Sequence, residues 1–209
     1  DNKENEFLQK YVDIPLFGLV TGSAKHKEIA YLKPNYYGTV QYQYGISLNK
    51  PQPKDIDVSP VTGTLGKDYR IDYGIFAFYG VANQKTAEQY QMVDDALISE
   101  LDEWTIKSIP TISAESRSKI GQNILAYLRV EYKDGNLPHD LRDFINVANS
   151  NNVKSLADMD IDFAPLSDHL SENIESIEKI HCFDSPKLAI SEELKEELDD
   201  EKINKIDIS

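Results

Sequence analysis

The sequence has 209 residues, 28% of them charged and 40% hydrophobic, and its formal net charge is −14. This composition is typical of a globular protein and excludes the disordered and fibrous classes. No run reaches the roughly 18 apolar residues of a membrane-spanning helix, and no signal-peptide pattern stands at the N-terminus. We therefore expect a cytoplasmic protein with no membrane partner, in which the single cysteine, Cys182, excludes an internal disulfide.

The negative charge is concentrated toward the C-terminal end. Residues 151 to 209 contain six lysines, no arginine and sixteen acidic residues, whereas residues 1 to 150 contain 16 basic and 20 acidic ones. Ligand binding depends on the local field of one face rather than on the net charge of the chain. A nucleic-acid site in the first 150 residues is therefore compatible with the overall acidity.

In chain order, residues 1 to 38 offer a helical piece near Glu4 to Tyr11 and no strongly apolar strand. Residues 39 to 48 ("TVQYQYGISL") alternate apolar and polar side chains, which predicts a half-buried strand. Its predicted inward face consists of Val40, Tyr42, Tyr44, Ile46 and Leu48. The next twenty residues are rich in proline and glycine and predict an excursion from the core that includes one arm of a hairpin.

Residues 69 to 82 ("YRIDYGIFAFYGVA") are apolar on both faces, which predicts a central strand with Phe76 and Phe78 in the core. Thr86 with Gln89 forms a capping-box signature, and the helical period that follows predicts one helix up to Pro110. Residues 124 to 132 ("ILAYLRVEY") alternate again and predict a third strand.

The remainder of the chain predicts helices. Pro138 suits a first helical turn, and the next apolar residues share one helical face; they are Leu141, Phe144, Ile145 and Ala148. Pro165 predicts the start of a second helix with Leu166, Leu170 and Ile177 inward. The acidic end predicts a charged helix or a frayed tail. We expect one elaborated domain over residues 1–185 and an acidic helical tail over 186–209.

The middle of the chain therefore runs strand, excursion, strand, helix, strand. This order matches the last four elements of a ferredoxin-like β-α-β-β-α-β domain, an α+β fold that is also called RRM-like. Its first strand and helix are missing, which would leave the strand around Leu128 without its neighbour. Because the first residue is Asp1 rather than Met, either an N-terminal segment outside this sequence supplies that strand or the topology is wrong.

Five stretches together resemble one known family. They are "DIPLFG" (13–18), "GTVQYQYGISLNK" (38–50), "TGTLGKDYRIDYGIFAFYGVAN" (62–83), "RSKIGQNILAYLRVEYKDG" (117–135) and "DFAPL" (162–166). In this order and spacing they are similar to the backbone subunit of type I-B CRISPR Cascade complexes, a member of the RAMP superfamily. The family's N-terminal strand and basic helix have no match here, and Pro15 and Ile46 replace residues that are often basic in relatives.

The resemblance implies a ferredoxin-like palm with inserted finger and thumb elements, the thumb lying within residues 50–67. It also implies a non-catalytic subunit that oligomerises along the spacer of a CRISPR RNA for antiviral defence. The implied partners are the CRISPR RNA, other copies of the chain, other Cascade subunits and, through the guide, target DNA. No cofactor, metal or catalytic residue is predicted.

A protein that accepts every spacer must grip phosphates and sugars rather than read base edges. The loop around Arg117 and Gln122 supplies cations and hydrogen-bond donors, and Gly121 allows close approach of the backbone. The predicted RNA-binding residues are Gln41, Gln43, Ser47, Asn49, Lys50, Lys54, Lys67, Arg70, Arg117, Ser118, Lys119 and Gln122. Val58, Val61 or Leu65 could supply an apolar wedge in the thumb.

Two alternatives stay open. The first is an RNA-cleaving backbone or a processing ribonuclease of the same superfamily, in which a loop aspartate or His26 would act. Against it, the four histidines are scattered along the sequence and are expected at the surface or at helix ends, and the cluster "DMDID" (158–162) is expected to be solvated acid. The second alternative is an acidic protein-interaction module without affinity for RNA.

Overall fold

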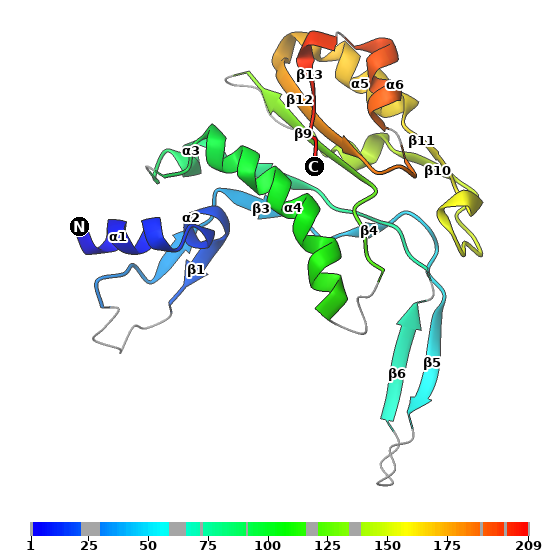
Figure 1. Ribbon diagram of the computed structural model, residues 1–209, viewed down its shortest axis with the longest axis horizontal. Helices are drawn as coiled ribbons and strands as arrows, with labels where there is room; N and C mark the ends of the chain where they lie inside the picture. Colours follow the sequence, from blue (N-terminus) through cyan, green and yellow to red (C-terminus); the bar gives the residue numbers. More distant parts are fainter. Residues whose placement is uncertain are drawn as a thin grey trace. The chain divides into compact units, whose positions relative to one another are not determined.

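The computed structural model describes residues 2–21, 30–58, 66–71, 73–90, 92–115, 121–133, 139–188, 190–198 and 200–208. It has a mixed α+β architecture with small sheets (Figure 1). The chain divides into two compact units: unit 1 comprises Asp1–Gln43, Gly80–Ile124 and Ile208–Ser209, and unit 2 comprises Tyr44–Tyr79 and Leu125–Asp207. No helix in the described ranges is both long enough and apolar enough to cross a membrane.

The helices of unit 1 come from two of its segments, Asp1–Gln43 and Gly80–Ile124. They are α1 (Asn2–Lys10), α2 (Asp13–Phe17), α3 (Gln84–Ala87) and α4 (Asp95–Glu115). Two antiparallel pairs accompany them: β1 (Gly18–Val20) with β2 (Asn35–Tyr37), and β3 (Val40–Tyr42) with β8 (Gly80–Ala82). Helix α1 confirms the helical piece predicted near Glu4. Two clusters of buried residues form the core: Leu8, Ile14, Leu32, Tyr36 and Tyr90, and Leu16, Val40 and Leu101.

The single helix predicted from Thr86 to Pro110 is wrong at both ends. Asn83 is the N-cap of α3, and its side-chain oxygen accepts a hydrogen bond from the Thr86 N–H at 3.3 Å, so Thr86 lies inside this short helix. The longer helix α4 begins only at Asp95 and continues through Pro110 to Glu115. Within the turn that contains the proline, the Thr111 hydroxyl donates to the Lys107 carbonyl at 2.8 Å.

Unit 2 is built around a three-stranded sheet. Its central strand β12 (Ile177–Asp184) runs antiparallel to β9 (Ala126–Tyr132) and parallel to β13 (Ile203–Lys205). Helices α5 (Ala164–Glu172) and α6 (Ile190–Glu197) lie together against this sheet (Figure 1). Their shared core consists of Phe163, Leu166, Leu170, Ile177, Ile180, Ile190, Leu194 and Leu198. Strand β9 confirms the third predicted strand.

Three antiparallel pairs complete the strands of unit 2. They are β4 (Ile46–Ser47) with β7 (Phe76–Ala77), β5 (Pro53–Val58) with β6 (Gly66–Ile71), and β10 (Asn146–Ala148) with β11 (Asp160–Asp162). The β5–β6 hairpin confirms that part of the predicted excursion is a hairpin. Val61 and Leu65, two of the three candidate wedge residues, lie outside the described residues.

The two strands predicted over residues 39–48 and 69–82 are each divided into short pieces. Strand β3 pairs with β8 in unit 1, whereas β4 pairs with β7 in unit 2, and residues 43–45 lie between them without strand structure. The prediction of a buried face was wrong for Tyr42, Tyr44 and Ile46, which are exposed. An alternating pattern reports a buried face only where one continuous strand packs on one core, and here the chain changes its pairing partner midway.

The C-terminal third also departs from the predicted helices. After Asp140 the chain forms a 3-10 turn (Leu141–Phe144) and then enters β10, instead of a helix. Helix α5 has its proline in the first turn, as predicted, but it ends at Glu172, and the buried Ile177 begins a strand. The acidic end does form a helix, α6, which packs into the core of unit 2, and β13 adds a strand to its sheet.

Candidate nucleic-acid interface

The polar residues predicted for the first strand divide between the two units. Gln41 lies in β3, opposite Val81 of β8, and Gln43 follows that strand; both side chains are exposed on unit 1. Ser47 lies in β4 and Asn49 just beyond it, in unit 2. The structure therefore groups these residues in pairs rather than along one strand face.

Asn49 is buried, with only 3% of its surface exposed. Its Oδ1 accepts a hydrogen bond from the Ile75 N–H at 2.8 Å, and its Nδ2 donates to the Tyr73 carbonyl at 3.3 Å. The Ser47 hydroxyl donates to the Asn49 carbonyl at 2.6 Å. Both the nitrogen and the oxygen of the Asn49 side-chain amide are thus hydrogen-bonded within the protein. Asn49 therefore holds the segment before β7 beside β4.

The aromatic residues predicted for the core are instead on the surface. Phe78 is 69% exposed and Phe76 is 47% exposed, and Tyr44 is 97% exposed. The Phe78 ring lies over the backbone of Gly45, where an added Cβ would be 2.6 Å from the ring. A Cβ added at Gly74 would likewise lie 2.7 Å from the Phe76 ring. Because glycine has no side chain, each ring rests on backbone instead of packing into a core.

A related arrangement occurs in unit 1. The ring of Tyr42 lies against Gly80, where an added Cβ would be 2.7 Å from a ring carbon. The Phe17 ring stacks with Tyr42 at a centroid distance of 6.4 Å and an interplanar angle of 28°. Gln41 and Gln43 flank Tyr42 in sequence. Unit 1 therefore also presents an exposed ring beside neutral amides.

The lysines of the predicted thumb lie at or within the β5–β6 hairpin. The Lys50 N–H donates to the Ser150 carbonyl at 2.9 Å, while its side chain is exposed. Lys54 is also exposed, and its Cα stands opposite Arg70 in the hairpin register. Lys67 stands opposite Asp57. The hairpin backbone thus brings the positions of Lys54 and Arg70 together.

Three residues of the predicted binding loop, Arg117, Ser118 and Lys119, lie outside the described residues. Gln122 is exposed, and Gly121 has a φ of 91°, a conformation that favours glycine. An added Cβ at Gly121 would meet no atom within 4 Å. This open backbone agrees with the space that a ligand would need for close approach.

Arg142 is a structural residue that the sequence reasoning did not identify. Its guanidinium forks onto Asp140 at 2.9 and 2.6 Å, donates to the Tyr44 carbonyl at 2.6 Å and lies 5.6 Å from the Tyr79 ring centre. These hydrogen bonds, despite opposing desolvation, hold the pKa of Asp140 below its usual range. Arg142 therefore anchors the backbone that carries the exposed ring of Tyr44. The signal in the sequence is the Asp-x-Arg spacing, which can form such a fork locally.

Two histidines lie where the sequence predicts, because His139 is exposed and His169 lies in the last turn of α5. His139 Nδ1 and His169 Nε2 are 3.0 Å apart although 30 residues separate them, and the His169 ring stacks on Phe144. His181 is buried in β12, where it contacts Glu131 and Asn204, so its predicted surface position is wrong. His26 lies outside the described residues. Within the described ranges, no three His, Cys, Asp or Glu side chains form a group that could hold a metal ion.

The "DMDID" carboxylates are exposed, as predicted, and two of them cap local structure. Asp158 accepts hydrogen bonds from the backbone of Lys154 and Ser155, both at 2.9 Å, and Asp162 accepts from the Ala164 N–H. These hydrogen bonds, the one from the Lys154 backbone first, lower the pKa of Asp158. The local backbone, rather than a metal, accounts for the placement of these two carboxylates.

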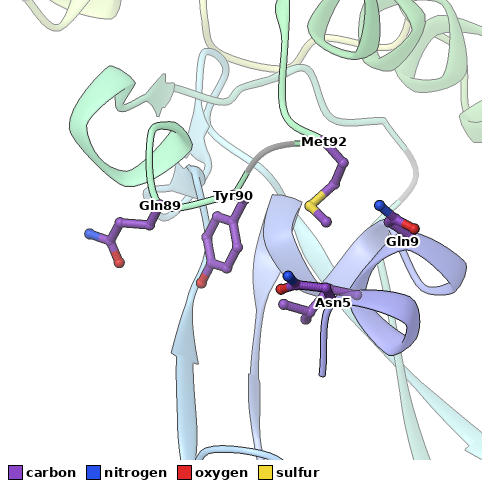
Figure 2. A pocket seen from close by; sticks show the side chains of 6 residues that line it. Asn5, Gln9, Gln89, Tyr90 and Met92 are labelled. Atoms are coloured by element: carbon purple, nitrogen blue, oxygen red, sulfur yellow. The ribbon is translucent and has the colours of Figure 1, made fainter. Parts of the chain in front are cut away.

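A small pocket lies beside α1 in unit 1 and has a volume of about 90 Å³ (Figure 2). Asn5 and Gln9 line it from α1, and Gln89, Tyr90 and Met92 line it from the segment after α3 (Figure 2). Known small-molecule sites have volumes of about 300–1,000 Å³. This pocket is therefore too small for a nucleotide, and none of its lining residues is charged.

The fold and these surfaces define a class of protein, namely a mixed α+β protein whose short strands expose aromatic rings, side-chain amides and lysine side chains. The family model described as CRISPR-associated protein Cas7 matches residues 1–164, and the chain belongs to this family. A similar curated relative is the CRISPR-associated protein Cas7 of Haloferax volcanii, 26% identical over 209 aligned residues. The match covers 88% of this chain and 61% of the relative, so the chain spans about three fifths of the relative's length.

Proposed function

We propose that this chain is a non-catalytic backbone subunit that binds CRISPR RNA and oligomerises along the guide spacer in a type I-B Cascade complex. Its membership of the Cas7 family supports this proposal. The observation that carries it is that unit 2 exposes the rings of Tyr44, Phe76 and Phe78 and the side chain of Lys50.

The chemistry of this surface suits RNA of any sequence. Aromatic rings stack on every base because each base has a π-face, and lysines attract phosphates without reading base edges. Phe76 and Phe78 rest on glycine backbone and leave much of their surface in solvent. Lys50 and Lys54 place cations in the same stretch of chain. Binding of RNA through these rings and lysines therefore does not depend on the base sequence of the RNA.

The wider assembly belongs to the same proposal. The partners are the CRISPR RNA, further copies of this chain, other Cascade subunits and target DNA that pairs with the guide. In this proposal the palm has the ferredoxin-like topology, and its thumb is the hairpin that β5 and β6 form. The loop of Arg117, Ser118 and Lys119, together with Gln122, contributes further phosphate contacts.

Binding of single-stranded RNA at several salt concentrations tests the RNA-binding part of this proposal. Oligonucleotides of unrelated sequence should bind with similar affinity, and log K should fall linearly with log salt, by about 0.7 per phosphate contact. Lys50→Ala should reduce that slope by about one contact. Phe78→Ala should weaken binding by about 1–3 kcal/mol, as expected for one stacked base.

Tyr37→Ala is the matched control, because Tyr37 is also an exposed aromatic residue but lies in β2 of unit 1 and is not one of the proposed RNA-binding residues. It should leave RNA affinity unchanged. Absence of binding at low salt would favour the protein-interaction module. Cleavage of guide-complementary RNA at regular intervals in the presence of Mg²⁺ would refute the non-catalytic assignment.

A further inference from the structure

Two histidine rings of unit 2 lie against each other, one just before the 3-10 turn (Leu141–Phe144) and one in helix α5. Nδ1 of His139 and Nε2 of His169 are 3.0 Å apart, and the ring centroids are 4.9 Å apart. Two imidazole nitrogens that bind one zinc ion at adjacent positions, each at about 2.0–2.1 Å, lie about 2.8–3.4 Å from each other. The separation of the two nitrogens therefore matches that of two ligands on one metal ion.

The contacts around the two rings hold them in position. The His169 ring stacks on Phe144, with the ring centroids 3.8 Å apart and an interplanar angle of 16°. His139 directly precedes Asp140, which caps the 3-10 turn by accepting a hydrogen bond from the Arg142 N–H at 3.1 Å. The 3-10 turn itself packs against α5. A metal ion that meets ligands already in position binds at a lower entropic cost.

The surroundings of the pair favour neutral rings and a cation beside them. Burial, and then the charge of His139, lower the pKa of His169, although Glu172 acts in the opposite direction. Only an unprotonated imidazole nitrogen binds a metal ion, so the lowered pKa keeps His169 available near neutral pH. The exposed carboxylate of Glu172 adds a negative charge that attracts a cation. His139 is exposed, so an ion can reach the pair from solvent.

We propose that His139 and His169 together bind one divalent transition-metal ion of the class of Zn²⁺, Ni²⁺ and Cu²⁺. Imidazole nitrogens suit these ions, whereas Mg²⁺ and Ca²⁺ prefer oxygen ligands. No three His, Cys, Asp or Glu side chains of the described residues form a metal-binding group, so water completes the coordination. The ring that donates the present hydrogen bond carries its proton on its other nitrogen when the ion binds. This proposal does not depend on RNA binding.

Isothermal titration calorimetry of the full-length natural protein with Zn²⁺, near neutral pH, tests the proposal. Loss of a group that only orients a metal ligand costs about 10–100-fold in affinity. His139→Gln and His169→Gln each remove a ligand, so each should weaken zinc binding at least about 10-fold. Asp160→Asn is the matched control, because it removes an exposed carboxylate of unit 2 that is not part of the pair. It should leave the affinity for zinc unchanged, and Mg²⁺ should not compete with zinc.

The NMR resonances of the ring nitrogens identify the atoms that bind the ion. Zinc should shift Nδ1 of His139 and Nε2 of His169. His181 is the internal control, because it is buried and its two ring nitrogens each lie 3.0 Å from a partner, Glu131 or Asn204. Its resonances should not move.

Three results would overturn the proposal. Absence of zinc binding would leave the pair as a hydrogen bond between two rings. An affinity for zinc that neither histidine substitution lowers would assign the ion to another part of the protein. A shift at Nε2 of His139 instead of Nδ1 would show that this ring binds zinc independently of His169.

Discussion

Asn49 joins the two segments that carry the exposed rings of unit 2. Its side-chain oxygen accepts a hydrogen bond from the Ile75 N–H, and its side-chain nitrogen donates one to the Tyr73 carbonyl. The main-chain carbonyl of Asn49 accepts a hydrogen bond from the Ser47 hydroxyl. A buried hydrogen-bonding group that loses its partner bears the cost of desolvation without compensation. Removing the Asn49 side chain would leave the buried Ile75 N–H in that state.

Asn49→Ala should lower the free energy of unfolding by about 1–3 kcal/mol, because it leaves these main-chain groups unpaired. Urea denaturation measures this change. Gln41→Ala is the control, since Gln41 is exposed and surface substitutions usually change stability by less than about 0.5 kcal/mol. Equal stability of the two variants would contradict the structural role of Asn49.

Glu131 carries a pH-dependent contribution to stability. Burial acts to raise its pKa, but the hydrogen bond and charge of Arg129, with a contribution from His181, lower the pKa overall. A carboxyl with a depressed folded pKa contributes stability above its unfolded pKa, about 4.3, and loses it as the pH falls through the folded pKa. The stability advantage of the native protein over Glu131→Gln should therefore shrink at acidic pH.

Denaturation of both proteins at intervals between about pH 7 and pH 3 measures this difference. Glu178→Gln serves as the control, because Glu178 is an exposed glutamate of β12. A Glu131→Gln difference that grows toward acidic pH would have the wrong sign and would contradict the assigned interactions.

At the scale of elements, Asp184 connects the sheet of unit 2 to helix α6. Its Oδ1 accepts hydrogen bonds from the Ile190 N–H at 2.9 Å and the Ser191 N–H at 3.1 Å, and its other oxygen accepts from the Ser191 hydroxyl. An aspartate at the end of β12 thus satisfies the first N–H groups of a helix that begins six residues later. The ammonium group of Lys205, in β13, lies 3.8 Å from the same carboxylate and forms an ion pair with it.

Asp184→Ala should destabilise the protein by about 0.5–2 kcal/mol, the range for loss of an N-terminal cap. Asp184→Asn should retain most of the stability, because an amide oxygen can still accept the helix N–H groups. Thermal unfolding of the three proteins compares these effects. If Asp184→Asn proved as unstable as Asp184→Ala, the ion pair with Lys205 would matter more than the cap.

Some elements could be predicted from sequence because their signals are local. Strand β9 alternates throughout its length, and Pro165 occupies the first turn of α5. Strand β12 was missed because an irregularity between Ile177 and Lys179 interrupts its alternation. Helix α4 was misplaced because the apolar spacing around Tyr90 and Val93 continues through a segment that contributes to the core without being helical.

For the whole molecule, the acidic C-terminal residues are part of the core rather than an addition to it. Ile190, Leu194 and Leu198 are buried beside residues of α5 and β12. Full burial of one such side chain stabilises a protein by about 1.5–3 kcal/mol. The free energy gained by burying all three side chains is comparable to the free energy of unfolding of a typical domain, about 5–15 kcal/mol.

Deletion of residues 190–209 should therefore abolish cooperative unfolding of unit 2. Near-UV circular dichroism and calorimetry would show loss of fixed tertiary structure. Glu192→Ala is the control, because Glu192 is an exposed acid of α6, and it should leave the transition intact. A truncated protein that retains a sharp transition would show that this end is dispensable.

The sequence by itself determined the local features of this protein: the amphipathic strand β9, the β5–β6 hairpin, the start of α5 and the motifs that resemble a CRISPR-associated family. Only the tertiary structure decided which residues face solvent. The exposed Phe78 ring rests against Gly45 of another segment, and Asn49 is buried where its amide hydrogen-bonds Tyr73 and Ile75. Such exposure depends on contacts between residues distant in sequence, and a periodic pattern does not encode these contacts.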